Sequence, residues 1–287
     1  MRHKSRASKL RTRLSTVVES LAELVRTLPV RRFKQGGAVV FVGPQLYFGD
    51  RSTDQQAIQF ALKREYEVLS ELLKLLIRGG PKEIVGNLKE ADEHFREWLD
   101  FNGSWSVTAD PTENARQVRA AAEPFERILD VLDLASEDEV LVVPETNSLL
   151  AEADPKAYRQ IADTTFVFML LPTVLGELDK LKIEHRNPDV RDKAKNVINR
   201  IKGWRKQGPL VDGVTVDKNI TVRASSREPD FKNTLSWLDK DNNDDRIIAS
   251  VVALQSEFPS AQVILVSGDI NLLNKADVAL IETAELP

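Results

Sequence analysis

Apolar positions recur at helical spacing through the first half of the chain. Near the N-terminus one apolar residue follows another every three or four positions, and the series ends before Pro29. Its members are Leu10, Leu14, Val17, Leu21, Leu24 and Leu28. This seam predicts one amphipathic helix docked on its own domain. The alternative is a short coiled coil that joins copies of the chain into a homo-oligomer through Leu10–Leu28.

Three further helices are predicted before residue 135. Apolar residues share one helical face over Asp54–Ile77 and again over Lys82–Leu99. A helix N-terminus is indicated by Asp110-Pro111-Thr112-Glu113, where an N-cap aspartate precedes a proline at the first helical position. Between the N-terminal helix and the helix predicted at Asp54–Ile77, the segment Ala38–Val42 is typical of a short strand. This half is therefore expected to be mostly helical.

Beyond residue 139 the pattern changes to strands that alternate with helices. The predicted strands are short and mostly apolar: Val140–Val143, Thr165–Leu171, Ile220–Ala224, Val263–Val266 and Ala279–Glu282. Helical patterns lie between them: Pro155–Ala162, Pro172–Lys182, Pro188–Lys206 and Asp245–Glu257. Strands that are apolar throughout are typical of a parallel sheet covered on both faces. The second half is thus predicted to be α/β with a mainly parallel sheet.

Three segments are expected from these patterns. Residues 1–35 form a basic amphipathic helical arm, residues 36–135 a mostly helical domain, and residues 136–287 an α/β domain. The acidic run Ser136–Glu139 is the predicted boundary. The arm carries ten Lys or Arg against two Glu, so it is suited to nucleic acid or another acidic surface.

Composition narrows the chemistry. The chain of 287 residues has no cysteine and three histidines, which disfavours thiolate and histidine-built metal sites. A metal site would then consist of oxygen ligands, which suit Mg²⁺ or Mn²⁺. No apolar run approaches the roughly 18 residues of a membrane span. We therefore expect a cytoplasmic protein without a membrane partner.

Acidic residues follow the predicted strands at corresponding places. Glu145 follows the strand Val140–Val143, and Asp269 follows the strand Val263–Val266. Because ligands of open α/β sheets bind beyond the carboxyl ends of the strands, both acids should lie at one edge. Glu177 lies in the helix after the second strand, while Asp244 and Asp245 open a later apolar helix. Carboxylates gathered in this way repel one another unless a cation holds them.

Each acid also has a structural interpretation. Asp244 or Asp245 could cap its helix, and Asp269 could be a turn residue beside Gly268. Glu177 alone resembles any solvated helix acid. We therefore base the prediction of a metal site on the acids taken together and on their order along the chain, and not on any one of them. The predicted metal ligands are Glu145, Asp244, Asp245 and Asp269.

That order resembles a PIN domain, a metal-dependent nuclease fold, in bacterial proteins that carry a helical N-terminal region. Four segments carry the resemblance: VVPETNSLL (142–150), TVLGELDKL (173–181), NNDDRIIA (242–249) and ILVSGDINL (264–272). It implies a three-layer α/β/α fold with a mainly parallel sheet, preceded by a mostly helical N-terminal domain. It also implies a divalent-metal-dependent endoribonuclease that cleaves single-stranded RNA with Mg²⁺ or Mn²⁺.

The resemblance assigns roles to residues. The catalytic acids would be Glu145, Glu177, Asp245 (or its neighbour Asp244) and Asp269. Ser267 takes the place of a hydroxyl residue that often precedes the fourth acid, and Asn147 would support the site.

Glu145 departs from the aspartate that the family carries at this position. One extra methylene moves the carboxylate by about 1.5 Å, which a near-octahedral Mg²⁺ site tolerates poorly. The alternative function is therefore a catalytically weakened or inactive PIN-like protein that binds nucleic acid or serves as a scaffold.

Basic residues concentrate in and around the helix predicted at Pro188–Lys206. This face could be merely solvated, or it could bind the phosphates of RNA without reading sequence. The residues predicted to bind RNA are Arg186, Arg191, Lys195, Arg200, Lys202 and Arg205.

Overall fold

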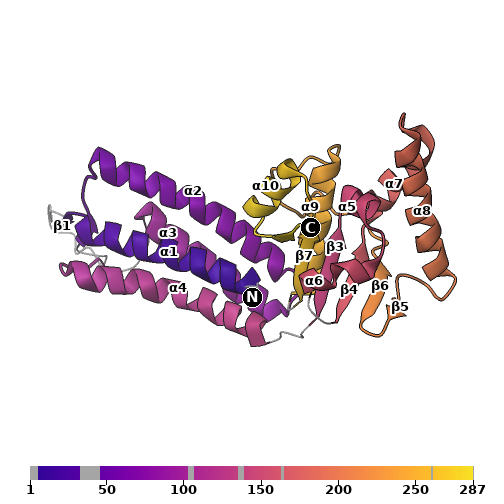
Figure 1. Ribbon diagram of the computed structural model, residues 1–287. Coiled ribbons are helices and arrows are strands. Elements are labelled where there is room, and N and C mark those ends of the chain that lie inside the picture. Colours follow the sequence, from indigo (N-terminus) through magenta and orange to yellow (C-terminus); the bar gives the residue numbers. More distant parts are fainter. Residues whose placement is uncertain are drawn as a thin grey trace. The chain divides into compact units, whose positions relative to one another are not determined.

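The computed structural model describes residues 6–32, 46–102, 107–134, 139–162, 165–259 and 261–286. The chain divides into two compact units, Met1–Leu134 and Ala135–Pro287 (Figure 1). The predicted strand Ala38–Val42 and the boundary residues 136–138 lie outside the described residues. Within the described residues, each helix is too short or too polar to cross a membrane.

The first unit consists of four helices and one small antiparallel strand pair. The helices are α1 (Arg6–Thr27), α2 (Thr53–Leu76), α3 (Lys82–Asp100) and α4 (Pro111–Leu134). The strands are β1 (Val30–Arg32) and β2 (Leu46–Phe48). Helix α1 packs against α4 and α2, and α3 packs against the same two helices. This bundle agrees with the mostly helical fold predicted for the N-terminal half.

Helix α1 is held in the bundle by both of its faces. Its six seam residues, from Leu10 to Leu28, are each at most 4% exposed, so the seam packs within its own unit. On the polar side, Arg11 donates to Asp130 at 2.9 Å and to Asp133 at 3.0 Å, and it also pairs with Glu126. The seam is thus buried as in the docked-helix interpretation, and it is not exposed to another copy of the chain.

A buried carboxylate joins α2 to α3. Asp92 is 5% exposed and accepts hydrogen bonds from Tyr66 (2.9 Å), Ser70 (2.6 Å), Lys74 (2.7 Å) and Arg96 (3.0 Å). Burial acts to raise the pKa of Asp92, but the hydrogen bonds from Lys74, Ser70 and Arg96 outweigh it and lower the pKa to about 2. The carboxylate is therefore charged and fully engaged, which fixes the register of the two helices.

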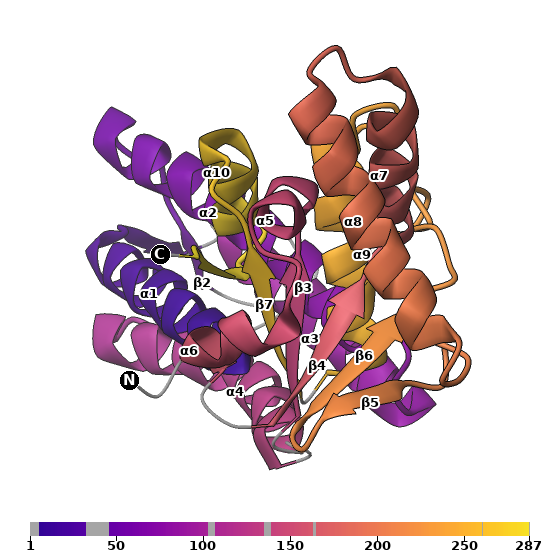
Figure 2. The same cartoon turned by 45° about the vertical axis from the view of Figure 1, so that its right-hand side comes forward.

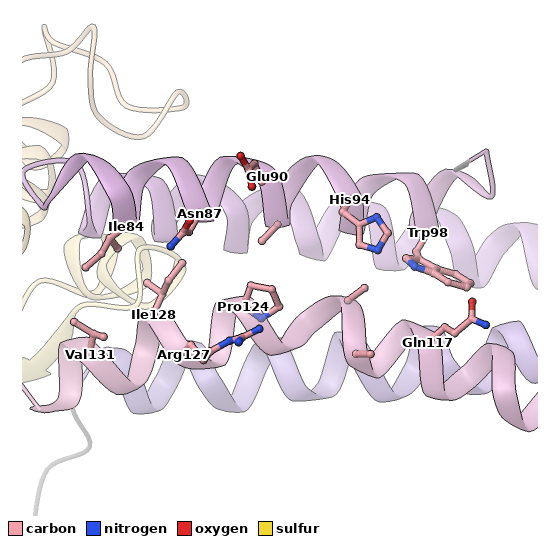
Figure 3. A pocket seen from close by; sticks show the side chains of 13 residues that line it. Ile84, Asn87, Glu90, His94, Trp98, Gln117, Pro124, Arg127, Ile128 and Val131 are labelled. Carbon is pink, nitrogen blue, oxygen red and sulfur yellow. The ribbon is translucent and has the colours of Figure 1, made fainter. Parts of the chain in front are cut away.

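The side of the bundle between α3 and α4 is open. The groove there has a volume of about 700 Å³. In Figure 3, Trp98 on α3 lies across from Gln117 on α4 at one end of the groove, and Asn87 lies across from Ile128 towards the other. Helix α4 continues through Pro124, whose ring lacks the donor for one helical hydrogen bond.

The second unit is built on a six-stranded sheet in the order β5-β6-β4-β3-β7-β8. The strands are β3 (Val140–Pro144), β4 (Phe166–Leu170), β5 (Val214–Asp217), β6 (Ile220–Ala224), β7 (Gln262–Val266) and β8 (Glu282–Ala284). All neighbouring pairs are parallel except β5 with β6. The central strands β3, β4 and β7 are buried along nearly their whole length, as expected for a sheet covered on both faces.

Helices connect these strands (Figure 2). They are α5 (Thr146–Ala151), the 3₁₀ turn η1 (Pro155–Tyr158), α6 (Arg159–Ala162), α7 (Pro172–Glu184), α8 (Pro188–Arg205), α9 (Asn243–Glu257) and α10 (Ile270–Val278). The mixed α/β architecture with a mainly parallel sheet confirms the predicted fold class. The helix predicted over Pro155–Ala162 consists of η1 followed by the short α6.

The last predicted strand was misplaced. Residues Ala279–Glu282 were expected to form it, but Ala279 ends α10 and Leu280 has a positive φ of 53°. A residue with a positive φ does not fit in a β-strand, so β8 begins only at Glu282. Strand β5 and helices α5 and α10 were not predicted from the sequence.

Replacing Asp92 by Asn should destabilise the first unit. The amide cannot accept from Lys74 and Arg96 as the carboxylate does, and loss of one partner of a buried ion pair costs about 3–5 kcal/mol. Denaturant unfolding of the full chain, followed by hydrogen exchange in α2 and α3, would measure the loss. Glu93→Gln, on the exposed side of the same helix, should cost about 0.5 kcal/mol or less. Equal losses in the two variants would contradict a special role for Asp92.

The same carboxylate should make the first unit acid-sensitive. The pKa of Asp92 falls from an ordinary 3.8 to about 2 in the folded chain, so its contribution is present above pH 3.8 and lost as the pH falls towards 2. The difference in unfolding free energy between the parent and Asp92→Asn should therefore shrink over this interval. A difference that does not change with pH would show that Asp92 is not charged in the folded protein.

Candidate active site

The strand order creates a crevice at the carboxyl ends of β3 and β7. From β3 the chain moves outward through β4 to β6, and then returns to the other side of β3 with β7 and β8. In open α/β sheets, ligands bind where the order reverses in this way. The backbone N–H of Glu145 donates to the carbonyl of Val266 at 3.0 Å, so the two strand ends are joined at this point.

Glu145 lies at the end of β3 and begins α5. The residue is 5% exposed, and its carboxylate accepts the N–H of Asn147 at 3.2 Å, which makes Glu145 the N-cap of α5. Its Oε1 accepts a hydrogen bond from the hydroxyl of Ser267 at 3.2 Å. A short helix and a neighbouring strand therefore fix the same side chain. Asn147 contributes this backbone donor, while its own side chain is exposed.

Asp269 holds the corresponding position after β7. Its carboxylate caps α10 by accepting the N–H groups of Asn271 at 2.7 Å and Leu272 at 3.3 Å. Its own N–H donates to Ser267 Oγ at 2.9 Å. Ser267 is completely buried and thus links Asp269 to Glu145. The hydroxyl that the sequence analysis proposed as a supporting group lies between the two acids.

Glu177 reaches the site from α7. One carboxylate oxygen accepts the side-chain amide of Asn243 at 2.6 Å, and the other accepts the hydroxyl of Thr146. Helices α5, α7 and α9 therefore meet at one side chain. Sequence reasoning did not single out Thr146 or Asn243, although both stand within the acidic motifs.

Neighbouring acids act electrostatically on Glu145. Burial raises the pKa of Glu145 above its ordinary value, and the N–H of Asn147 and the hydroxyl of Ser267 oppose this effect. The negative charges of Asp269 and Glu177 raise the pKa of Glu145 further. Repulsion of this kind favours a bound cation, because a cation would stabilise all three charges together.

Asp244 and Asp245 are engaged differently. Asp245 is 6% exposed, with Lys275 Nζ 2.7 Å from one carboxylate oxygen and the N–H of Asp239 at 2.9 Å from the other. Asp244 lies 3.5 Å from the same ammonium group. Neither acid caps α9, because Asn242 accepts the N–H of Asp245 at 3.2 Å. The helix-cap interpretation of this acid pair is therefore wrong.

Lys275 is a residue that sequence reasoning missed. It belongs to α10, the helix that Asp269 caps. Burial lowers the pKa of Lys275, but its hydrogen bond with Asp245 and the charges of both aspartates outweigh this effect and raise it. Without a predicted helix over residues 270–278, nothing in the sequence placed this lysine beside the start of α9.

The acids open onto a cavity of about 390 Å³. Glu145 and Asp269 line it together with Asn147, Gly268 and Glu285. Glu177, Asp244 and Asp245 lie outside its lining. The structure therefore brings the first and fourth predicted acids to one cavity and keeps the third acid against Lys275.

The donor set fits a hard divalent cation. Within the described ranges, no three Asp, Glu, His or Cys side chains are gathered closely enough to enclose a metal ion. Mg²⁺ often binds through only one or two carboxylates and completes its shell with water and substrate phosphates. Glu145 and Asp269, joined by Ser267 at one cavity, supply such a pair.

The basic residues predicted to bind RNA lie in α8 and just before it. Three of them are engaged within the protein: Arg191 donates to the carbonyl of His185 at 2.6 Å, Lys195 pairs with Asp192 at 3.0 Å, and Arg200 pairs with Asp154 at 3.3 Å. For Arg186, Lys202 and Arg205, the described part of the chain contains no acidic partner within ion-pair distance. These three cations are the ones best placed to meet phosphate.

The comparison with known protein families agrees with this geometry. Residues 142–286 match the family model described as the PIN domain, a family associated with nucleases. The matched range begins within β3 and includes every acid of the site. No curated protein matches the chain. Because the match covers 145 of 287 residues, more than half of the sequence, the chain belongs to the PIN domain family.

Proposed function

We propose that the second unit is a divalent-metal-dependent endoribonuclease that hydrolyses phosphodiester bonds of single-stranded RNA. The observation that carries this proposal is the linked pair Glu145–Ser267–Asp269, set in a cavity at the point where the strand order reverses. Family membership supports nuclease chemistry in general, and the choice of RNA and of the metal belongs to the proposal.

Each residue of the site has a distinct role in this proposal. Glu145 and Asp269 hold Mg²⁺ or Mn²⁺, and Ser267 fixes the distance between them by bonding to both residues. A divalent ion there supplies a water of lowered pKa and neutralises charge on the phosphate. Glu177, oriented by Thr146 and Asn243, adds a third negative charge beside the pair.

Asp244 and Asp245 are proposed to act together with Lys275. Its ammonium group holds the start of α9 against α10 and balances one of the two carboxylate charges, so the pair keeps a net charge of about −1. Arg186, Lys202 and Arg205 provide positive charge for the RNA backbone, which raises affinity without reading the sequence.

A specific observation also favours the alternative function, a weakened or inactive PIN-like protein that binds nucleic acid. Glu145 stands where the family carries aspartate, and its raised pKa reduces its charge at acidic pH. Its longer side chain is already committed to Asn147 and Ser267. Cleavage and binding assays on position 145 separate the two functions.

Asp269→Asn should abolish most RNA cleavage while preserving the fold. Asparagine caps helices as well as aspartate does, so α10 remains intact, but the metal loses a charged ligand. The rate should fall by more than the roughly 10–100-fold that loss of an outer-shell metal partner costs. Cleavage of labelled single-stranded RNA with Mn²⁺, with and without EDTA, measures the effect.

Asp277→Asn is the matched control for this experiment. Asp277 is an exposed acid on the same helix, so its replacement should leave the rate unchanged. Cleavage at the parental rate by Asp269→Asn would show that the nuclease site has been assigned wrongly.

Glu145→Asp should increase cleavage if the length of the side chain limits the metal geometry. A gain of roughly tenfold corresponds to about 1.4 kcal/mol of activation free energy. Glu145→Gln, which keeps the length and removes the charge, should lose activity. If neither variant changes a low basal rate while RNA binding persists, the binding function is favoured over the nuclease.

A further inference from the structure

A second cavity lies at the same edge of the sheet, between α7, α8 and the end of β6. We call it the α7–α8 pocket; its volume is about 420 Å³, within the range of small-molecule sites. Helices α7 and α8 pack side by side, as Figure 2 shows. Because β6 runs parallel to β4, the residues that follow β6 lie at the carboxyl edge, as do those that follow β3. The pocket therefore opens on the edge that carries the acids.

The walls of the pocket are apolar. Leu175 contributes from α7, and Ile198 and Ile201 contribute from α8. Leu210 and Val211 close the opposite wall, and the carbonyl of Leu210 accepts the N–H of Ala224 at 2.9 Å, which ties that wall to the end of β6. Val211 is 53% exposed, so part of the apolar surface faces solvent. A flat, apolar group would be sheltered from water there.

One rim of the pocket is cationic. Lys202 and Arg205 line it from the end of α8, and neither has an acidic partner within ion-pair distance in the described residues. The carboxylate of Asp179, which also lines the pocket, pairs with Lys182. Ser225 also lines the pocket and adds a hydroxyl. An apolar interior beside two cations and a hydroxyl complements a nucleotide, whose base is flat and whose phosphate is anionic.

The pocket stands at a fixed distance from the acids. Leu175 and Asp179 line it, and Glu177 lies between them in sequence. In an α-helix, residues two positions apart in sequence point in directions that differ by about 200° around the axis. Glu177 therefore points to the opposite side of α7 from Leu175 and Asp179. There it contacts Thr146 and Asn243. One helix diameter, about 10–12 Å, therefore separates the pocket from the carboxylate of Glu177.

We propose that the α7–α8 pocket binds the base of one nucleotide of a single-stranded RNA, while Lys202 and Arg205 hold an adjoining phosphate. This inference rests on the proposed nuclease function and adds a determinant of where the RNA lies. The base is held against the apolar walls on one side of α7, and the chain crosses α7 to reach Glu145 and Asp269. A double helix cannot offer an unstacked base in this way, so single strands are preferred.

Binding measured without divalent metal tests the pocket separately from cleavage. The full chain, in EDTA, is titrated into a fluorescently labelled oligoribonucleotide, and anisotropy gives the Kd. Val211→Asn makes the apolar wall polar at an exposed position that the fold tolerates, and it should raise the Kd about fivefold to tenfold. Val211→Leu keeps the wall apolar and should bind as the parent does.

The salt dependence of the RNA affinity separates the contribution of the cations from that of the apolar wall. Arg205→Ala should raise the Kd and reduce the slope of log Kd against log salt by about one, because one phosphate contact is lost. Val211→Asn should leave this slope unchanged. Lys193→Ala is the matched control, since Lys193 is exposed on the same helix and does not line the pocket.

Four outcomes, the last two given together, would overturn the proposal. The first is parental affinity in Val211→Asn. The second is an equal loss in Lys193→Ala and Arg205→Ala, which would show that diffuse charge holds the RNA. The third is failure of adenosine or uridine monophosphate at millimolar concentration to compete with the labelled RNA, or absence of RNA binding in EDTA. Loss of cleavage in Asp269→Asn with unchanged binding leaves the pocket supported, so failure of one proposal is distinguishable from failure of the other.

Discussion

Repulsion between carboxylates at one buried strand edge is the constraint on which this site depends. The negative charges of Asp269 and Glu177 raise the pKa of Glu145, and a folded chain without a cation must offset that cost. The protein does so with N–H and hydroxyl donors at the starts of helices, where the helix dipole also favours negative charge. Helices α5 and α10 are short, and each begins at an acid that it helps to stabilise.

The remaining acids are stabilised by full positive charge. Lys275 balances one of the two charges of Asp244 and Asp245, and in the first unit Lys74 and Arg96 neutralise Asp92. Glu145 and Asp269 are held by N–H and hydroxyl donors, which carry no net charge. Positive partners, more than burial, therefore separate the carboxylates that hold helices together from the pair that lines the cavity.

The sequence predicted the features that depend on local pattern. The strand Ile220–Ala224 was predicted with its observed bounds, and the order of the acids indicated the family. Features that depend on packing could not be predicted. Helix α5 has six residues, too few for a helical period to be recognised. Lys275 and Asn243 acquire their roles only when α9, α10 and α7 come together in the fold. The apolar spacing of α1 likewise predicts a buried face, but it does not show which helices cover that face.

The pairing of β3 with β7 has a consequence for how the protein is made. Pro144 lies beside Val266 in the sheet. The crevice therefore forms only when residues more than a hundred positions apart in sequence come together, whereas the contacts within each helix of the first unit are local. Contacts so distant in sequence form slowly and late. During synthesis the helical unit can fold first, while the acids stay apart until β7 has emerged. The acidic cavity therefore forms after the helical unit, once β3 and β7 can pair.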